Sequence, residues 1–190
     1  MKELVVATNN PGKLKEIREI LEGFTILSLK DIGFTQEIDE PFETFEENAY
    51  AKAKAIFDYC GKNVISDDSG ICANALGGKP GVHSAHYSGT RNDEENLQFL
   101  IENLSLYTDK SAYYIAVICL IENGQAKYFE GRCNGVIINE KRGSNGFGYD
   151  PSFVPNGYSK TIAELTPEEK NKISHRGKAL EKLVVYLDTQ

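Results

Sequence analysis

The dipeptide Asn123-Gly124 constrains the fold of this chain more than any other short segment. It lies between the stretches 111–122 and 125–131, and Asn-Gly in this position is the strongest short-range signal of a β-hairpin. Strands connected by so short a loop pair antiparallel. The centre of the chain therefore predicts an antiparallel pair, with a further strand at Val136-Ile137-Ile138.

The N-terminal part of the chain has the pattern of a strand followed by a helix. Residues 3–8 form an apolar run that is typical of a buried strand. Apolar residues then recur at helical spacing between residues 13 and 21. Because Asn10 before Pro11 is a favourable N-cap and first helical residue, a strand–loop–helix unit is expected here.

The rest of the sequence alternates between strand and helix patterns. The short apolar run Val64-Ile65 predicts a buried strand that ends at a sharp turn in Ser66-Asp67-Asp68-Ser69-Gly70. Helices are predicted at 44–60, where Thr44 and Glu47 have capping-box spacing, at 93–103, and at 168–188 with a break near 174–177. This order predicts the α/β class, with an elongated mixed β-sheet and flanking helices.

Length and composition limit the classes of protein to consider. With 190 residues, 41% of them hydrophobic, the chain can bury a core as one large domain or as a compact two-lobed one. No apolar run approaches a membrane span, and the first one is too short for a signal peptide. The net charge of −7 argues against a nucleic-acid-binding surface but leaves room for a small polyanionic ligand. The cysteines are too far apart for a CxxC motif and are expected to be reduced core thiols of a cytosolic protein: Cys60, Cys72, Cys119 and Cys133.

Two adjacent carboxylates, Asp67 and Asp68, follow the predicted strand directly. Charge at this point is costly unless a cation or hydrogen bonds compensate it, and open α/β sheets bind ligands at the carboxyl ends of their strands. The pair therefore predicts a Mg²⁺ site for a phosphate-bearing ligand. Because adjacent strand residues point to opposite faces, one acid is expected to bind metal and the other to hold the turn. Asx turns that only end the strand are the alternative.

Two other segments of the N-terminal half carry candidate charges. The loop from Thr8 to Lys13 leads into a helix N-terminus, whose free N–H groups favour an anion together with the lysine. An ordinary capped helix with a solvated lysine is the alternative. Glu40 lies outside the second predicted helix and could reach a metal ion, whereas Asn48 and Lys52 share a helix face that is typical of a solvated surface.

A glycine-rich segment, Gly143 to Pro151, surrounds Phe147 with glycines. Such glycines keep the backbone close and expose the ring, on which a planar base could stack. Asp150 is restricted by the proline that follows it, which suits a fixed polar contact. A surface loop whose aromatic residue packs into the core is the alternative.

The histidines and a neighbouring arginine are the last candidates. His175 and Arg176 offer donors for a carbonyl or phosphate acceptor, although such a pair on a helix surface is often only solvated. His83 and His86 are three residues apart, but they lack a third ligand and a helix to align them, so metal binding is not expected of them.

Taken together, six motifs resemble one family in the order in which that family carries them, over nearly the whole chain. The sequence resembles the non-canonical purine nucleoside triphosphate pyrophosphatase family, also called the inosine triphosphate pyrophosphatase family. The matching segments are Ala7 to Lys13, Thr44 to Ala49, Ser66 to Gly70, Pro80 to Ala85, Gly146 to Pro151 and Ser174 to Leu180.

The resemblance implies a fold, a reaction and partners. The fold is an elongated mixed sheet in a single domain, residues 1–190, whose two α/β lobes flank a central cleft. The reaction is Mg²⁺-dependent hydrolysis of ITP, dITP or XTP to the monophosphate and pyrophosphate. The implied protein is a cytoplasmic homodimer that acts on a small-molecule nucleotide, with neither a nucleic acid nor a membrane as partner.

The resemblance also implies a role for individual residues. Asp68 is the proton acceptor and, with Glu40, a ligand of Mg²⁺. The implied substrate contacts are Thr8, Asn9, Asn10, Pro11, Gly12 and Lys13 for the triphosphate, Ser69, then Phe147, Gly148, Tyr149 and Asp150 for base and sugar, and Lys170, His175 and Arg176 for the nucleotide.

The chemistry of these residues agrees with that reaction. Phosphoryl transfer needs positioning and positive charge, which Mg²⁺ and Lys13 would supply, and a carboxylate near the metal could activate water. His175 and Arg176 would donate hydrogen bonds to the 6-oxo group of hypoxanthine or xanthine. Adenine would leave them unpaired, which can give discrimination of about 10⁴.

Alternatives and one departure from the family remain. A related pyrophosphatase for modified pyrimidine or standard deoxynucleotides is one alternative, and a nucleotide sensor without catalysis is another. His83 and His86 stand where the family usually has tyrosine and arginine. If that arginine aids phosphate binding or a dimer contact, His86 would make the role pH-dependent.

Overall fold

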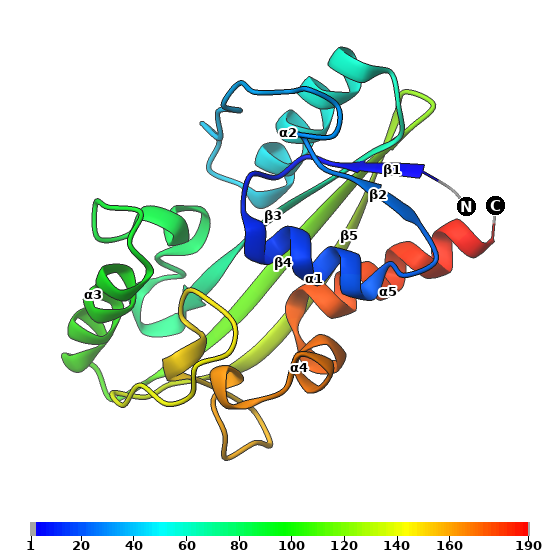
Figure 1. Cartoon of the computed structure of the whole chain (residues 1–190). Coiled ribbons are helices and arrows are strands. Elements are labelled where there is room, and N and C mark those ends of the chain that lie inside the picture. The colour runs from blue at the N-terminus through cyan, green and yellow to red at the C-terminus, as the bar shows by residue number, and fades with distance from the viewer. Residues whose placement is uncertain (1–2, 190) are drawn as a thin grey trace. The chain divides into compact units, whose positions relative to one another are not determined.

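Six strands form one mixed sheet in the computed structural model, which describes residues 3–189 (Figure 1). Their order across the sheet is β2-β1-β3-β4-β5-β6, where β1 pairs in parallel with β2 and β3, and β5 pairs antiparallel with β6. The strands are β1 (Glu3–Val6), β2 (Thr25–Leu27), β3 (Val64–Ala73), β4 (Ser111–Glu122), β5 (Gln125–Ile137) and β6 (Phe153–Pro155). The mixed sheet with flanking helices confirms the predicted α/β class.

Five α-helices and four short 3₁₀ helices complete the described part of the chain. The α-helices are α1 (Pro11–Ile20), α2 (Phe45–Cys60), α3 (Asp93–Ser105), α4 (Pro167–Ile173) and α5 (His175–Asp188). The 3₁₀ helices are η1 (Asn74–Leu76), η2 (Gly81–His86), η3 (Asp150–Ser152) and η4 (Ile162–Glu164). Within residues 3–189, no helix is both long and apolar enough to cross a membrane.

The contacts divide the chain into two compact units. Unit 1 contains the described residues up to Asp68, then Ala116–Gly131, and the described residues from Lys178 onward. Unit 2 contains Ser69–Ile115 and Arg132–Gly177. The long strands β3, β4 and β5 contribute residues to both units.

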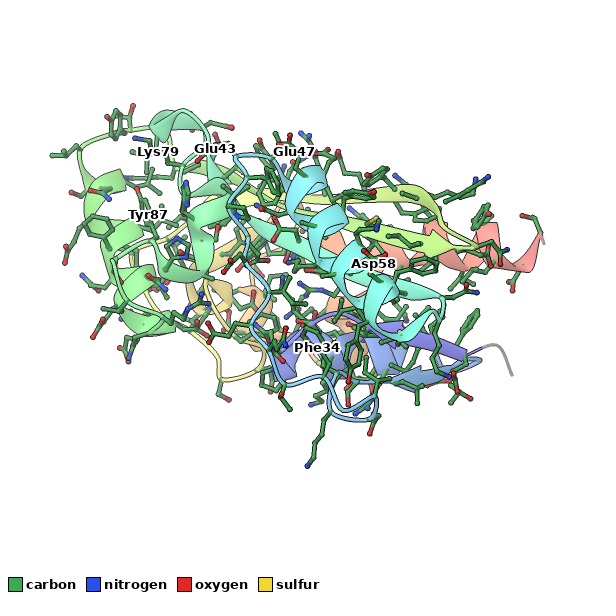
Figure 2. The ribbon with its side chains drawn as sticks, turned by 90° about the horizontal axis from the view of Figure 1, so that it is seen from above. Phe34, Glu43, Glu47, Asp58, Lys79 and Tyr87 are labelled. Atoms are coloured by element: carbon green, nitrogen blue, oxygen red, sulfur yellow. The ribbon has the colours of Figure 1, made fainter. Side chains whose placement is uncertain are left out.

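In unit 1, helices cover both faces of the sheet. The α1 and α5 helices pack on one face, where Ile17 and Leu183 share a buried apolar cluster with Val6 of β1 (Figure 1). The α2 helix covers the other face, and the Ser66 hydroxyl donates to the carbonyl of Ala49 at 2.6 Å. The loop between β2 and α2 carries Phe34, and the same unit carries Glu43, Glu47 and Asp58 (Figure 2).

In unit 2, the core gathers around α3 and β4. Leu97, Leu100 and Leu104 of α3 join one buried cluster with Tyr114 and Phe153. Tyr114 and Tyr149 belong to this cluster, and the Tyr114 hydroxyl contacts the buried Asp150. The core of unit 2 therefore positions Asp150. Lys79 and Tyr87, on either side of η2, also belong to this unit (Figure 2).

Several local predictions are confirmed. Asn10 is the N-cap of α1, its side chain accepting the Lys13 N–H at 3.1 Å, with Pro11 as the first helical residue. Asn123 and Gly124 both have positive φ, 51° and 77°, which fits the two-residue hairpin turn between β4 and β5. Thr44 likewise caps α2.

Two strand predictions are wrong in their boundaries. Residues 136–138 do not form a separate strand, because β5 runs without interruption to Ile137. More importantly, Ser66 to Gly70 is not a turn: β3 continues through it to Ala73. Gly70 serves close packing instead, since a Cβ there would lie 2.3 Å from the carbonyl oxygen of Gly81.

The predicted break in the last helical region is confirmed. Ser174 has an extended backbone and separates α4 from α5. Its hydroxyl accepts the Gly177 N–H at 3.0 Å, so the residue that ends one helix caps the next. Gly177 permits the close approach, because a Cβ on it would lie 1.8 Å from the carbonyl oxygen of Asn171.

Candidate functional site

The loop between β1 and α1 positions Lys13. The Thr8 hydroxyl accepts the Asn10 N–H at 3.1 Å, and the Asn10 cap fixes the first turn of α1. From that turn the Lys13 ammonium reaches Asp67 Oδ1 at 2.6 Å. The lysine is therefore held by a partner, and the alternative of a merely solvated lysine is wrong.

The two acids of β3 contact different helices, as the alternation of a strand requires. Asp67 is fully buried and pairs with Lys13 of α1. Asp68 is buried too, and its Oδ1 lies 3.2 Å from the ammonium of Lys52 on α2. The prediction that the acids do different jobs fits this geometry, but Asp67 holds a lysine rather than a turn.

Lys52 is the cation that contacts both Glu40 and Asp68. The sequence predicted it on a solvated helix face. Its ammonium donates to the Glu40 carboxylate, to Asp68 Oδ1 and, at 2.8 Å, to the backbone carbonyl of Asp67. A signal was available, because Lys52 lies one helical turn from both Ala49 and Ile56, on the stripe that α2 buries. We call Lys13, Glu40, Lys52, Asp67 and Asp68 the carboxylate–lysine cluster.

The two acids around Lys52 differ in proton affinity. Burial raises the pKa of Asp68 and the nearby Glu40 carboxylate raises it further, while the lysines offset this only in part. Burial also acts to raise the pKa of Glu40, but attraction to Lys52 and Lys13 together with hydrogen bonding lowers the pKa overall. Burial opposes the charge of Lys52, yet Asp68 and Glu40 raise its pKa, so it stays an ammonium. Asp68 is thus the better proton acceptor of the pair.

The donor set of the cluster fits a hard divalent cation. Asp68 Oδ2 is buried and has no hydrogen-bond partner, although a buried carboxylate oxygen normally has one. Glu40, close to it, adds a second carboxylate. No group of three or more acidic, histidine or cysteine side chains suited to a metal occurs within residues 3–189. Two carboxylates, completed by water and phosphate oxygens, suit Mg²⁺ in particular.

In unit 2, Asp150 is the centre of a second buried group. Its Oδ2 accepts the Lys170 ammonium at 2.8 Å and the Phe147 N–H at 3.1 Å. Its Oδ1 accepts the Tyr114 hydroxyl at 2.9 Å. We call Tyr114, Phe147, Asp150, Lys170, His175 and Arg176 the Asp150 cluster. Tyr114 was missed by sequence reasoning, because nothing in its strand pattern distinguishes it from a core tyrosine.

Two cations lie over the Phe147 ring in this cluster, and a separate aromatic contact joins His175 to Tyr114. The Lys170 ammonium lies 4.9 Å from the centre of the Phe147 ring and the Arg176 guanidinium 5.9 Å. Arg176 also donates to the Ser69 hydroxyl at 3.0 Å. The His175 ring is stacked on that of Tyr114, with centroids 4.6 Å apart. His175 and Arg176 are both buried, so the alternative of a solvated pair is wrong.

The loop that carries Phe147 is anchored along its length. Ser144 and Asn145 both donate their N–H groups to the carbonyl of Ala163, and Gly148 donates to Asp93 Oδ2 at 2.9 Å. Beside the loop is a pocket of about 280 Å³, lined by residues 143–148 together with Asp93, Glu94, Leu97, Lys141 and Pro151. Gly146 must be small, because a Cβ on it would lie 2.1 Å from Asp150 Oδ2.

Some predicted contacts lie apart from these clusters. The Tyr149 ring belongs to the core, where its hydroxyl donates to the Ser84 carbonyl at 2.6 Å, so only its backbone is left for a ligand. Asn9 and Asn10 in the loop before α1 are exposed, as is Pro11, the first residue of that helix. His83 and His86 are exposed and pack edge to face at 5.5 Å.

The cysteines fit their prediction with one exception. All four are free; Cys72, Cys119 and Cys133 are buried, whereas Cys60 at the end of α2 is partly exposed. Burial raises the pKa of the Cys119 thiol to about 12. These thiols are therefore packing residues rather than part of either cluster.

The fold and the two clusters define a mixed α/β protein with one charged centre at a strand and one aromatic–cation centre at a glycine-rich loop. Residues 4–186 match the sequence model of the Ham1 family, and the chain belongs to that family. It is 46% identical to the dITP/XTP pyrophosphatase of Bacillus subtilis, with 99% of this chain and 98% of the relative covered.

Solved structures agree with this assignment. A HAM1 protein from Coxiella burnetii superimposes with a TM-score of 0.91 at 39% identity, covering 100% of both chains. The Ham1 protein of Staphylococcus aureus gives a TM-score of 0.89 at 38% identity, covering 99% of both chains.

Proposed function

We propose that this chain is a pyrophosphatase that hydrolyses dITP, XTP and ITP to the nucleoside monophosphate and pyrophosphate. The observation that carries the proposal is the buried, unpartnered Asp68 Oδ2 beside Glu40, flanked by two lysines. Buried carboxylate oxygens normally have a hydrogen-bond partner, so this oxygen suits a cation that arrives with the substrate. Membership of the Ham1 family and similarity to proteins named dITP/XTP pyrophosphatase supply the substrate class.

The carboxylate–lysine cluster would handle the triphosphate. Glu40 and Asp68 would hold Mg²⁺, which would neutralise charge on the phosphate oxygens. Lys13, at the N-terminus of α1, adds positive charge where the loop from Thr8 to Gly12 offers its N–H groups. Asp68, whose pKa is raised by burial, would take the proton of the attacking water.

The Asp150 cluster would bind the base and sugar. Phe147 offers a ring face, while His175 and Arg176 offer donors for a 6-oxo group. Lys170 and Asp150 neutralise each other, so they hold the loop rather than add net charge. Ser69, next to the acids of β3, is placed by its bond to Arg176. Gly148 and Tyr149 would contribute backbone contacts.

The wider setting is also part of the proposal. We expect a single functional domain over residues 1–190, acting as a homodimer in the cytoplasm on a small nucleotide, without nucleic acid or membrane. The net charge of −7 argues against a nucleic acid as partner.

One experiment tests the reaction and its substrate class together. Purified protein with Mg²⁺ is given ITP, dITP, XTP, GTP, ATP and a modified pyrimidine nucleotide, and pyrophosphate and orthophosphate are measured separately. We expect pyrophosphate from the first three substrates and little from ATP. Orthophosphate as the first product contradicts the reaction. A preference for the pyrimidine supports the related pyrophosphatase, and binding without turnover supports a sensor.

A further inference from the structure

Tyr114 on β4 contacts two residues proposed to bind the base, by two different parts of its side chain. Its hydroxyl donates to Asp150 Oδ1 at 2.9 Å. Its ring lies parallel to the His175 imidazole, with centroids 4.6 Å apart and planes 8° apart. The side chain is buried, with 7% of its surface exposed, so it cannot reach a substrate except through these neighbours.

The hydroxyl donates to the Asp150 oxygen that Lys170 and Phe147 do not occupy. Oδ2 already accepts two donors, the Lys170 ammonium and the Phe147 N–H. The Tyr114 hydroxyl donates to Oδ1. Because both oxygens then have donors, the carboxylate cannot rotate freely, and it holds the Phe147 loop in one position. Burial and the nearby carboxylate both raise the pKa of Tyr114 well above its ordinary value, so its hydroxyl stays protonated and can donate at neutral pH.

Packing alone does not explain the residue. The Tyr114 ring also contacts Phe153, with centroids 4.8 Å apart, and a phenylalanine would fill the same space. A phenylalanine would, however, remove one hydrogen bond from a buried carboxylate. The parallel stack likewise restricts the imidazole of His175, which follows Ser174 at the start of α5.

We propose that Tyr114 is a positioning residue for the purine base, which orients Asp150 through its hydroxyl and the plane of His175 through its ring. The choice of a purine nucleotide as substrate rests on the proposed function, whereas the contacts of Tyr114 with Asp150 and His175 do not depend on it. The two effects are separable, because Tyr114→Phe removes only the hydroxyl and Tyr114→Leu removes both.

The kinetic test compares these variants on dITP. For Tyr114→Phe we expect the KM to rise about tenfold with kcat within about twofold, as expected for one lost hydrogen bond to a charged group. For Tyr114→Leu we expect a larger rise and a smaller preference for dITP over dATP, because the imidazole plane is no longer fixed. Tyr113→Phe makes the same chemical change on the neighbouring residue of β4 and should leave the KM unchanged.

A second readout uses the free protein and no substrate. The chain has three histidines, so His175→Gln assigns the ring protons of His175 in the NMR spectrum. The Tyr114 ring should shift these protons upfield in wild type and in Tyr114→Phe, and the shift should disappear in Tyr114→Leu. This measurement needs no turnover. If the wild type hydrolyses no dITP, the proposed function is wrong, but the NMR result still tests the contact between Tyr114 and His175.

Each outcome decides one part of the proposal. An unchanged KM in Tyr114→Phe overturns the role of the hydroxyl, and His175 resonances that do not move in Tyr114→Leu overturn the role of the ring. If kcat falls instead of KM rising, the residue acts on the chemical step and the positioning role is wrong. A Tyr114→Phe protein that no longer folds would make the hydroxyl a core element and would also overturn it.

Discussion

The two clusters bury charge in opposite ways. In the Asp150 cluster each oxygen of the carboxylate has a donor, and Lys170 neutralises it. In the carboxylate–lysine cluster Glu40 and Asp68 compete for Lys52, and one buried oxygen has no partner. A complete network holds its geometry before a ligand arrives, whereas an incomplete one gains its missing interactions from a ligand. Neutralising the acid should therefore lower stability in the Asp150 cluster, and should lower turnover in the carboxylate–lysine cluster.

The largest effect is expected for Asp68→Asn. The amide cannot accept a proton and is a weaker ligand for a divalent cation, so kcat should fall about 10³- to 10⁴-fold. Stability should not fall, because the change removes a buried charge with an unpartnered oxygen. Steady-state kinetics and thermal unfolding measure the two effects.

Glu37→Gln is the control for this change. Glu37 is an exposed carboxylate on the loop that leads to Glu40, and its loss should alter neither property. Substantial turnover by Asp68→Asn would remove Asp68 from the reaction. A large loss of stability would make the carboxylate–lysine cluster a structural one, like the cluster around Asp150.

Asp150→Asn should show the reverse pattern. The Lys170 ammonium, 6% exposed, would then face a neutral amide, and breaking such a buried pair costs about 3–5 kcal/mol. Urea unfolding measures this loss. The double variant Asp150→Asn with Lys170→Met removes both charges and should recover much of the stability. No recovery would mean that the loss comes from the Phe147 loop rather than from the unpaired ammonium.

Lys52→Met removes the cation between Glu40 and Asp68 from the carboxylate–lysine cluster. Without this ammonium, Glu40 and Asp68 repel each other, and the metal-free protein should lose about 2–4 kcal/mol. Because a divalent cation can replace the lost charge, Mg²⁺ should raise the Tm of the variant more than that of wild type. An equal Mg²⁺ effect in both proteins would argue against metal binding by these two acids.

Lys54→Met is the matched control on the same helix. Lys54 pairs with Asp58 on the exposed side of α2, where such pairs contribute about 0–1 kcal/mol. Neither its stability nor its response to Mg²⁺ should differ much from wild type.

Sequence reasoning succeeded where the signal is local. The hairpin at Asn123-Gly124, the Asn10 cap and the break near Ser174 depend on residues within one turn of each other, and all three are confirmed. The acids of β3 were found, yet their surroundings were predicted wrongly. The polar residues after Ile65 predicted a turn. In the structure they lie within β3, where Asp67 pairs with Lys13 and Asp68 pairs with Lys52.

The missed residues share a different property. Lys52 and Tyr114 gain their roles from partners distant in sequence, such as Asp68 and Asp150. The strand pattern around Tyr114 indicates no site, and the helical pattern around Lys52 indicates its burial but not its partners. Such residues become visible only when the fold brings their partners together.

The smallest expected effect concerns the hydrogen bond that holds the Phe147 loop of the Asp150 cluster to α3. Asp93, the first residue of α3, accepts the Gly148 N–H at 2.9 Å, whereas its neighbour Glu94 pairs with Lys141 on the exposed surface. Asp93→Ala should raise the KM for dITP about fivefold, with kcat nearly unchanged and stability lower by about 1 kcal/mol, since one charge-assisted bond is lost. Glu94→Ala removes a neighbouring carboxylate and should change the KM little. Equal effects of the two variants would mean that α3 contributes only its charge, and that the loop is held by its bonds to Ala163 and Asp150 alone.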